Sequence, residues 1–181
     1  MRLFAAIVPP ADALDHLATA IDPVRDDRLR WSRPDAWHLT LAFYGEVPDE
    51  RLDELTERLH RAARRQQQLS LALSGAGRFD GRVLWVGCSG DLDGLRKFSR
   101  SCGAAGRRAG AAIDEQRRFR PHLTLARAAR PVDLRDHVAT LAGYRGPSWT
   151  ASELALIRSS LGAGPDGRPR YELLASFELA G

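Results

Sequence analysis

The pentapeptide HLTLA stands at residues 38–42 and is repeated letter for letter at residues 122–126, so its two histidines lie 84 positions apart in a chain of 181 residues. Each copy alternates polar and apolar residues, which predicts a strand with one buried face. Because residues i and i+2 of a strand point to the same side, each copy presents a histidine and a threonine together. The repeat therefore predicts two matched halves, each with an imidazole and a hydroxyl on one face.

A proline follows each copy at a similar distance. Pro48 lies ten residues after His38, and Pro131 lies nine residues after His122. We expect each proline to open a helix with an apolar stripe, because proline is favoured in the first turn of a helix. The repeated unit is then strand, loop, proline and helix, which predicts two related lobes facing each other across a cleft. We interpret residues 1–181 as a single bilobal domain.

The rest of the chain alternates helical and strand-like segments. Apolar residues at helical spacing predict helices over residues 14–21 and 91–108. Short apolar or alternating runs predict strands over residues 2–8, 29–32, 69–74, 83–88, 153–160 and 171–179. The glycine-rich segment 75–81 precedes a strand rather than a helix, so we interpret it as a hairpin connection and not as a phosphate-binding loop. This order of elements indicates an α+β fold with mostly antiparallel sheets.

Composition and charge limit the class of protein. Hydrophobic residues make up 44% of the chain and charged residues 28%, as is ordinary for a globular protein. The net charge is +4, and 26 of the 27 basic residues are arginine. Guanidinium groups suit phosphates, so this balance favours an anionic partner such as nucleic acid.

Cysteine usage and the lack of long apolar runs bear on the compartment. Cys88 and Cys102 form no CxxC pair, and we interpret them as reduced, partly buried thiols. No run approaches the roughly 18 apolar residues of a membrane span. We therefore expect a cytoplasmic protein with no membrane partner, and nothing in the sequence requires more than a monomer.

Two histidines and two threonines are sufficient for cleavage of a phosphodiester without a metal ion. Near neutral pH one imidazole can accept a proton while the other donates one. The threonine hydroxyls can donate hydrogen bonds to the non-bridging oxygens, where negative charge builds up. Neither copy has a carboxylate at ligand spacing, and HExxH and GxSxG motifs are missing, so we expect no metal site, no cofactor and no serine nucleophile. We interpret His16 and His137, on helical segments, as structural or solvent-facing.

Several segments match a known family. They are residues 2–5, residues 38–47, residues 119–127, the pair Ser159-Ser160 and the pair Arg170-Tyr171. With these segments the chain resembles the 2H phosphoesterase superfamily, whose mark is the paired HxTx motif. Within it the chain is similar to the RNA 2′,3′-cyclic phosphodiesterases, also called 2′-5′ RNA ligase-like proteins. The resemblance covers essentially the whole chain. It implies two antiparallel sheets with flanking helices, related by a pseudo-twofold axis around a basic cleft.

The resemblance also implies an activity and roles for residues. The activity is hydrolysis of a terminal 2′,3′-cyclic phosphate of RNA to a 2′-phosphate, a step of RNA processing, with no metal or nucleotide cofactor; reverse 2′-5′ ligation stays open. By position, His38 would protonate the leaving 3′ oxygen and His122 would activate water. Thr40 and Thr124 would hold the phosphoryl oxygens.

Two further residues are candidates for substrate contacts, and two other functions remain open. Arg127 is a candidate for contact with a phosphate or a base, but a strand of strict period would turn it away from the cleft, so this contact requires a bend or a bulge. Phe4 is a candidate for stacking on a base; the alternative is a core aromatic on a buried strand. The open functions are a non-catalytic module that binds RNA ends and a 2H enzyme for another cyclic or 2′-5′ linked nucleotide.

Overall fold

The structure is a computed structural model, and it describes residues 1–113, 118–164 and 167–181. Its strands form two antiparallel sheets. The first sheet has the order β3 (Leu39–Glu46), β1 (Arg2–Ile7), β8 (Glu153–Ser160), β9 (Arg170–Glu178). The second has the order β2 (Arg30–Trp31), β6 (His122–Arg127), β5 (Val83–Gly90), β4 (Leu69–Phe79), β7 (Arg145–Ala151). The predicted α+β class with two antiparallel sheets is confirmed.

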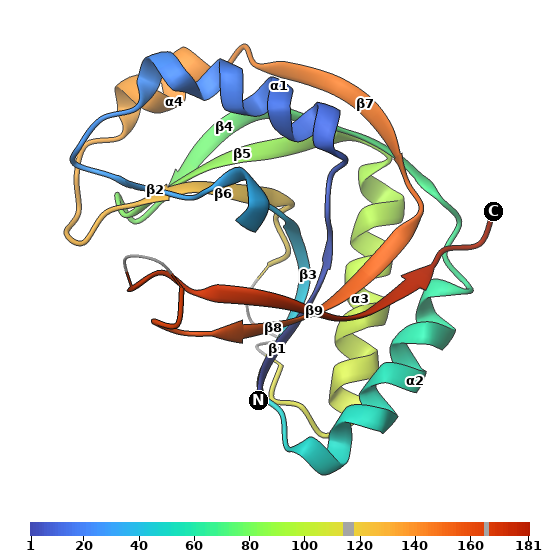
Figure 1. Cartoon of the computed structure of the whole chain (residues 1–181). Helices are drawn as coiled ribbons and strands as arrows, with labels where there is room; N and C mark the ends of the chain where they lie inside the picture. Colours follow the sequence, from blue (N-terminus) through green and yellow to red (C-terminus); the bar gives the residue numbers. More distant parts are fainter. Residues whose placement is uncertain (114–117, 165–166) are drawn as a thin grey trace.

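Helices cover both sheets, as Figure 1 shows. Their bounds are α1 (Ala11–Ile21), α2 (Leu52–Ala63), α3 (Leu92–Arg108) and α4 (Arg135–Leu141). Helices α1 and α4 contact strands of the second sheet, whereas α2 and α3 contact strands of the first. Two helices therefore cross from one sheet to the other. Helix α1 follows β1 of the first sheet and packs on the second sheet, and α3 follows β5 of the second sheet and packs mainly on β3 of the first.

The two halves repeat one arrangement of elements. In the first half β1, α1 and β3 occur in this order, with the two-residue strand β2 between α1 and β3, and β1 pairs with β3 in antiparallel fashion. In the second half β5, α3 and β6 follow one another, and β5 pairs with β6 in the same way. Each HLTLA copy thus lies on the second strand of its unit. The duplication inferred from five letters extends to a strand, a helix and a returning strand.

Helix α3 holds the strand of the first copy in place. It begins at the capping residue Asp91, whose carboxylate accepts a hydrogen bond of 2.9 Å from the backbone N–H of Gly94. Its close approach to β3 depends on Gly106, where a Cβ atom would come within 2.5 Å of the Tyr44 ring. The Tyr44 hydroxyl donates to the carbonyl of Cys102 at 3.2 Å. Backbone and ring therefore meet without a gap at this buried contact.

Some predicted boundaries are wrong, for local reasons. The hairpin at residues 75–81 exists, but β4 continues to Phe79 and only Asp80 and Gly81 turn the chain, both with positive φ (50° and 62°). Pro131 does not open a helix, since α4 begins at Arg135 and the Val132 N–H instead donates to the Gly81 carbonyl. Pro48 is followed by one 3₁₀ turn before α2.

Strand β7 has no counterpart among the predicted elements, and two other predictions are only partly testable. β7 is the outer strand of the second sheet, and it contains a proline and mixed polarity rather than an alternating pattern. Proline is tolerated in such edge strands, where its missing N–H faces no partner. The glycines and the proline of residues 162–167 predict a turn, and the sequence predicts no regular element over residues 110–116. Both segments extend into positions outside the described residues.

Candidate active site

The two HLTLA strands meet where the sheets adjoin, since β3 contacts β6. Their leucines, at positions 39, 41, 123 and 125, are buried, as the alternation predicted. The partners His38, Thr40, His122 and Thr124 are half-buried. We call the side of each sheet that carries its histidine and threonine the site face. Among the described residues, neither threonine hydroxyl has a hydrogen-bond partner, so both are available to a ligand.

Both imidazoles are held in the same way. The Nδ1 atom of His38 lies 2.9 Å from the carbonyl oxygen of Ala36, and that of His122 lies 2.7 Å from the carbonyl oxygen of Arg120. A carbonyl oxygen can only accept, so Nδ1 carries the proton in both rings. In the neutral form Nε2 is then the basic nitrogen of each. The two anchors give the histidines matching tautomers at equivalent positions.

Aromatic side chains pack on each imidazole. His38 stacks on Phe4 with ring centroids 4.6 Å apart, and the edge of Tyr171 meets it at 5.2 Å. Phe79 and Trp85 lie 5.0 Å and 5.9 Å from the ring of His122. A pair of aromatic rings thus orients each histidine from its own sheet.

The environment of His38 changes its charge. Burial lowers the pKa of His38 to about 4, the Ala36 carbonyl raises it, and the positive charges of His122 and Arg127 lower it further. His38 is therefore neutral at pH 7 in the ligand-free protein. Because His122 and Arg127 act on His38 electrostatically, side chains of both sheets share one site.

A β-bulge brings Arg127 to the site face. Thr124 pairs with Trp85, whereas Ala126 pairs with Leu84, so Leu125 is an extra residue in β6. Arg127 pairs with Val83, which lies on the same side of β5 as Trp85. The bulge that an Arg127 contact requires is therefore present.

The same irregularity occurs in the first copy, at Leu41, between the pairs that Thr40 and Ala42 form with β1. A bulged residue loses its place in the ladder, and its carbonyl needs another donor. The hydroxyl of Ser99 on α3 donates to the Leu41 carbonyl at 2.6 Å, and the backbone N–H of Ser32 donates to the Leu125 carbonyl at 2.8 Å. Both halves thus contain a stabilised bulge directly after the threonine.

Phe4 lies on the site face of the first sheet and is 3% exposed. It belongs to a small apolar cluster separate from the main core, with Ala6, Ala155 and Ile157. Next to this cluster Tyr171 is 37% and Leu173 62% exposed. This burial agrees with the interpretation of Phe4 as a core aromatic, and its ring also packs on His38. Stacking of Phe4 on a base stays a prediction.

Three aromatic neighbours of the histidines were not among the predicted site residues: Phe79, Trp85 and Tyr171. Tyr171 had a signal in the sequence, because the pair Arg170-Tyr171 is one of the segments that match the family. Trp85 had none, because its place beside His122 depends on the register between β5 and β6. The glycine at position 77 is part of this arrangement, since a Cβ there would overlap the Trp85 ring.

His16 and His137, two of the three histidines on helices, have structural partners. The Nδ1 atom of His16 lies 3.0 Å from the Tyr144 hydroxyl. His137 is buried, and its Nε2 donates to the carboxylate of Asp26 at 2.7 Å. Both contacts join distant parts of the chain, which confirms the structural interpretation.

Both cysteines are free thiols, as predicted. Within the described ranges, no helix is long and apolar enough to cross a membrane.

Two antiparallel sheets that meet at paired histidine–threonine strands are the architecture expected of a 2H phosphoesterase. A family model for the 2′-5′ RNA ligase superfamily matches residues 13–163. The chain belongs to this superfamily, which confirms the resemblance inferred from the motifs.

Known relatives and structures agree with this assignment. The chain is 32% identical to the RNA 2′,3′-cyclic phosphodiesterase of Escherichia coli, over 98% of this chain and 96% of that protein. It is 30% identical to a protein of the same name from Geobacillus stearothermophilus, over 83% of this chain but only 48% of that longer protein. The crystal structure of E. coli LigT complexed with 3′-AMP superposes with a TM-score of 0.81 at 30% identity, covering 99% of this chain and 98% of that chain.

Proposed function

We propose that this chain hydrolyses the terminal 2′,3′-cyclic phosphate of RNA to a 2′-phosphomonoester, with His38 and His122 as acid and base. The observation that carries the proposal is the pair of equivalent imidazoles, each with its Nδ1 bound to a carbonyl and its Nε2 as the reactive nitrogen. Relatives with the name RNA 2′,3′-cyclic phosphodiesterase, similar over nearly the whole chain, support the enzyme class and the substrate.

The reaction needs one proton to be removed and one to be delivered. His122 takes a proton from water as its oxygen forms a bond to phosphorus. The bond from phosphorus to the 3′ oxygen breaks, and His38 delivers a proton to that oxygen, which leaves the phosphate on the 2′ oxygen. The hydroxyls of Thr40 and Thr124 donate to the non-bridging oxygens, and the guanidinium of Arg127 balances their charge. The symmetry of the site does not itself assign the two roles, which follow the family resemblance.

His38 has to gain a proton before it can act as the acid. Its pKa is about 4 in the ligand-free protein, mainly because of burial. A bound cyclic phosphate brings a negative charge next to the ring, and an opposite charge favours the protonated form. We infer that binding of the substrate and protonation of His38 are coupled. The same groups acting in the opposite direction would support 2′-5′ ligation.

The proposal includes a single bilobal domain, a monomer, and the cytoplasm as compartment. One continuous apolar cluster supports the single domain, since it joins Leu3 and Leu39 of the first sheet to Leu84 and Leu123 of the second. Free thiols at both cysteines agree with a reducing compartment.

Substitution of each histidine tests the mechanism. Either His38→Gln or His122→Gln should lower kcat on an RNA with a 2′,3′-cyclic end by roughly 10²–10⁴-fold. His16→Gln is the matched control, because His16 lies on α1, contacts Tyr144 and is not among the site residues, so the variant should retain activity. Full activity of either active-site variant would contradict the proposal. A non-catalytic RNA-end module would bind the RNA without turnover, and a 2H enzyme of other specificity would prefer another cyclic or 2′-5′ linked nucleotide.

A further inference from the structure

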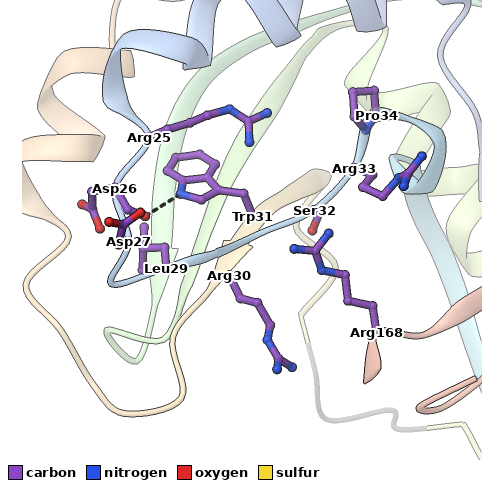
Figure 2. A pocket seen from close by; sticks show the side chains of 10 residues that line it. All are labelled: Arg25, Asp26, Asp27, Leu29, Arg30, Trp31, Ser32, Arg33, Pro34 and Arg168. Atoms are coloured by element: carbon purple, nitrogen blue, oxygen red, sulfur yellow. Dashed lines mark hydrogen bonds between the residues drawn. The ribbon is translucent and has the colours of Figure 1, made fainter. Parts of the chain in front are cut away.

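A hollow of about 450 Å³ lies beside β2, outside the set of catalytic residues. Figure 2 shows its lining, which consists of side chains from residues 25–34 and of Arg168. The segment 25–34 includes β2 of the second sheet, whereas Arg168 lies just before β9 of the first sheet. Both halves of the protein therefore contribute to this hollow. Four of its lining residues are arginines: Arg25, Arg30, Arg33 and Arg168.

Two of these guanidinium groups have no protein partner. Within the part of the chain that the structure describes, the side chains of Arg30 and Arg168 form neither a hydrogen bond nor an ion pair. The Nε–H of Arg168 is buried and has no hydrogen-bond acceptor among the described residues, which is costly unless a ligand accepts a hydrogen bond from it. The Nε–H of Arg33 donates to the carboxylate of Asp35 at 3.3 Å, and this contact does not involve the two terminal nitrogens of Arg33.

The carboxylates of the hollow lie apart from this positive end. In Figure 2, Asp26 and Asp27 occupy the end opposite to Arg33 and Arg168. Asp26 accepts hydrogen bonds from Arg28 at 2.9 Å and from His137 at 2.7 Å, so its charge is already compensated. Arg25 lies over the Trp31 ring at 5.4 Å and does not reach the same end. The guanidinium end therefore keeps uncompensated positive charge.

Strand pairing connects the hollow to the active site. Arg30 pairs with Arg127 across β2 and β6, and paired residues point to the same side of a sheet. Arg127 lies on the site face with Thr124, so Arg30 extends that face beyond Arg127 and into the hollow. A nucleic acid strand whose end lies between the histidines and that runs along β6 and β2 would pass Arg127, then Arg30, then Arg168.

We propose that this hollow binds a phosphodiester of the RNA strand on the 5′ side of the terminal cyclic phosphate. Planar guanidinium forks suit the two non-bridging oxygens of a phosphodiester, and an unpaired Nε–H supplies one donor of such a fork. The inference rests on the proposed function, since it specifies the substrate of the same site. It assigns oligonucleotides, rather than nucleoside 2′,3′-cyclic monophosphates, as the preferred substrates.

Two substrates separate this proposal from the proposed function. One is a nucleoside 2′,3′-cyclic monophosphate, and the other is a short RNA with the same terminal nucleotide. Arg168→Gln should raise KM for the RNA about tenfold, the usual cost of a lost charged hydrogen bond, and leave KM for the mononucleotide unchanged. Arg30→Gln should act in the same direction. The control Arg65→Gln removes one charge from the exposed turn after α2 and should change neither value.

Each outcome decides one of the two statements. Equal effects on both substrates, or no effect on the RNA, overturn the hollow as an RNA subsite. If the wild-type protein turned over neither substrate, the proposed function would be contradicted. The hollow would then be tested by fluorescence anisotropy with a labelled RNA that ends in a 2′-phosphate. Arg168→Gln should weaken that binding about tenfold and make the slope of log K against log salt shallower by roughly 0.7; an unchanged affinity and slope would overturn the inference.

Discussion

The ring of His38 stacks on the ring of Phe4 at 4.6 Å with an angle of 29° between the planes. The stack shields the imidazole from water, and this burial is the main reason why the pKa of His38 falls to about 4. A pH titration of the His38 ring signals by NMR should therefore give a midpoint far below the usual 6.5 or so. Inorganic phosphate should raise that midpoint, because its negative charge stabilises the imidazolium.

Phe4→Ala provides the matched change. Removal of the phenyl ring exposes the imidazole, and the midpoint of His38 should move up toward the ordinary value. A wild-type midpoint near 6.5, or an unchanged midpoint in Phe4→Ala, would show that burial by Phe4 does not control this group.

Ser99→Ala tests the support of the first bulge. Ser99 is buried and its hydroxyl donates to the Leu41 carbonyl at 2.6 Å. Loss of the donor leaves a buried carbonyl unsatisfied, so the free energy of unfolding should fall by about 1–3 kcal/mol in a denaturant titration. The control is Ser101→Ala on the same helix, where the hydroxyl is exposed and bonds within the helix to Lys97. Comparable losses in the two variants would argue against a role of the bulge in stability.

Gly77→Ala tests the position of Trp85 beside His122. A Cβ at position 77 would overlap the indole ring, so the ring or the strand has to move. We expect a loss of about 1–3 kcal/mol in stability, as in other overpacked sites, and a decrease in kcat of roughly tenfold or more as His122 loses its neighbour.

Gly143→Ala is the control for this variant, since a Cβ there meets nothing within 4 Å. It should change kcat and stability little. If Gly77→Ala kept full kcat while losing stability, Trp85 would have a packing role only.

The repeated pentapeptide was enough to predict much of the site. Alternation assigned His38 and Thr40 to one face and their leucine neighbours to the core, and the second copy obeys the same rule. It was not enough for Arg127. Its direction depends on a bulge, which exists only relative to the partner strand β5 and leaves no mark in the local pattern.

Elements whose form depends on tertiary contacts were also missed. β7 is an edge strand with mixed polarity, and only its pairing with β4 makes it a strand. The segment after Pro131 is not helical before Arg135, because the Val132 N–H donates to the carbonyl of Gly81 in the turn, and a helical pattern of apolar residues does not reveal this bond. Likewise, Arg168 is far in the sequence from Arg25, Arg30 and Arg33, and it joins them only because the two halves meet.

The position of the phosphate in the product tests the central claim most directly. A short RNA with a 2′,3′-cyclic phosphate would be incubated with the protein, and the product would be analysed by treatment with a 3′-specific phosphatase and by ³¹P NMR. Two-histidine catalysis with the 3′ oxygen as leaving group predicts a 2′-phosphomonoester that resists the phosphatase. Release of a 3′-phosphate would contradict the claim. An RNA end that stays cyclic after incubation with the folded wild-type protein would also contradict it.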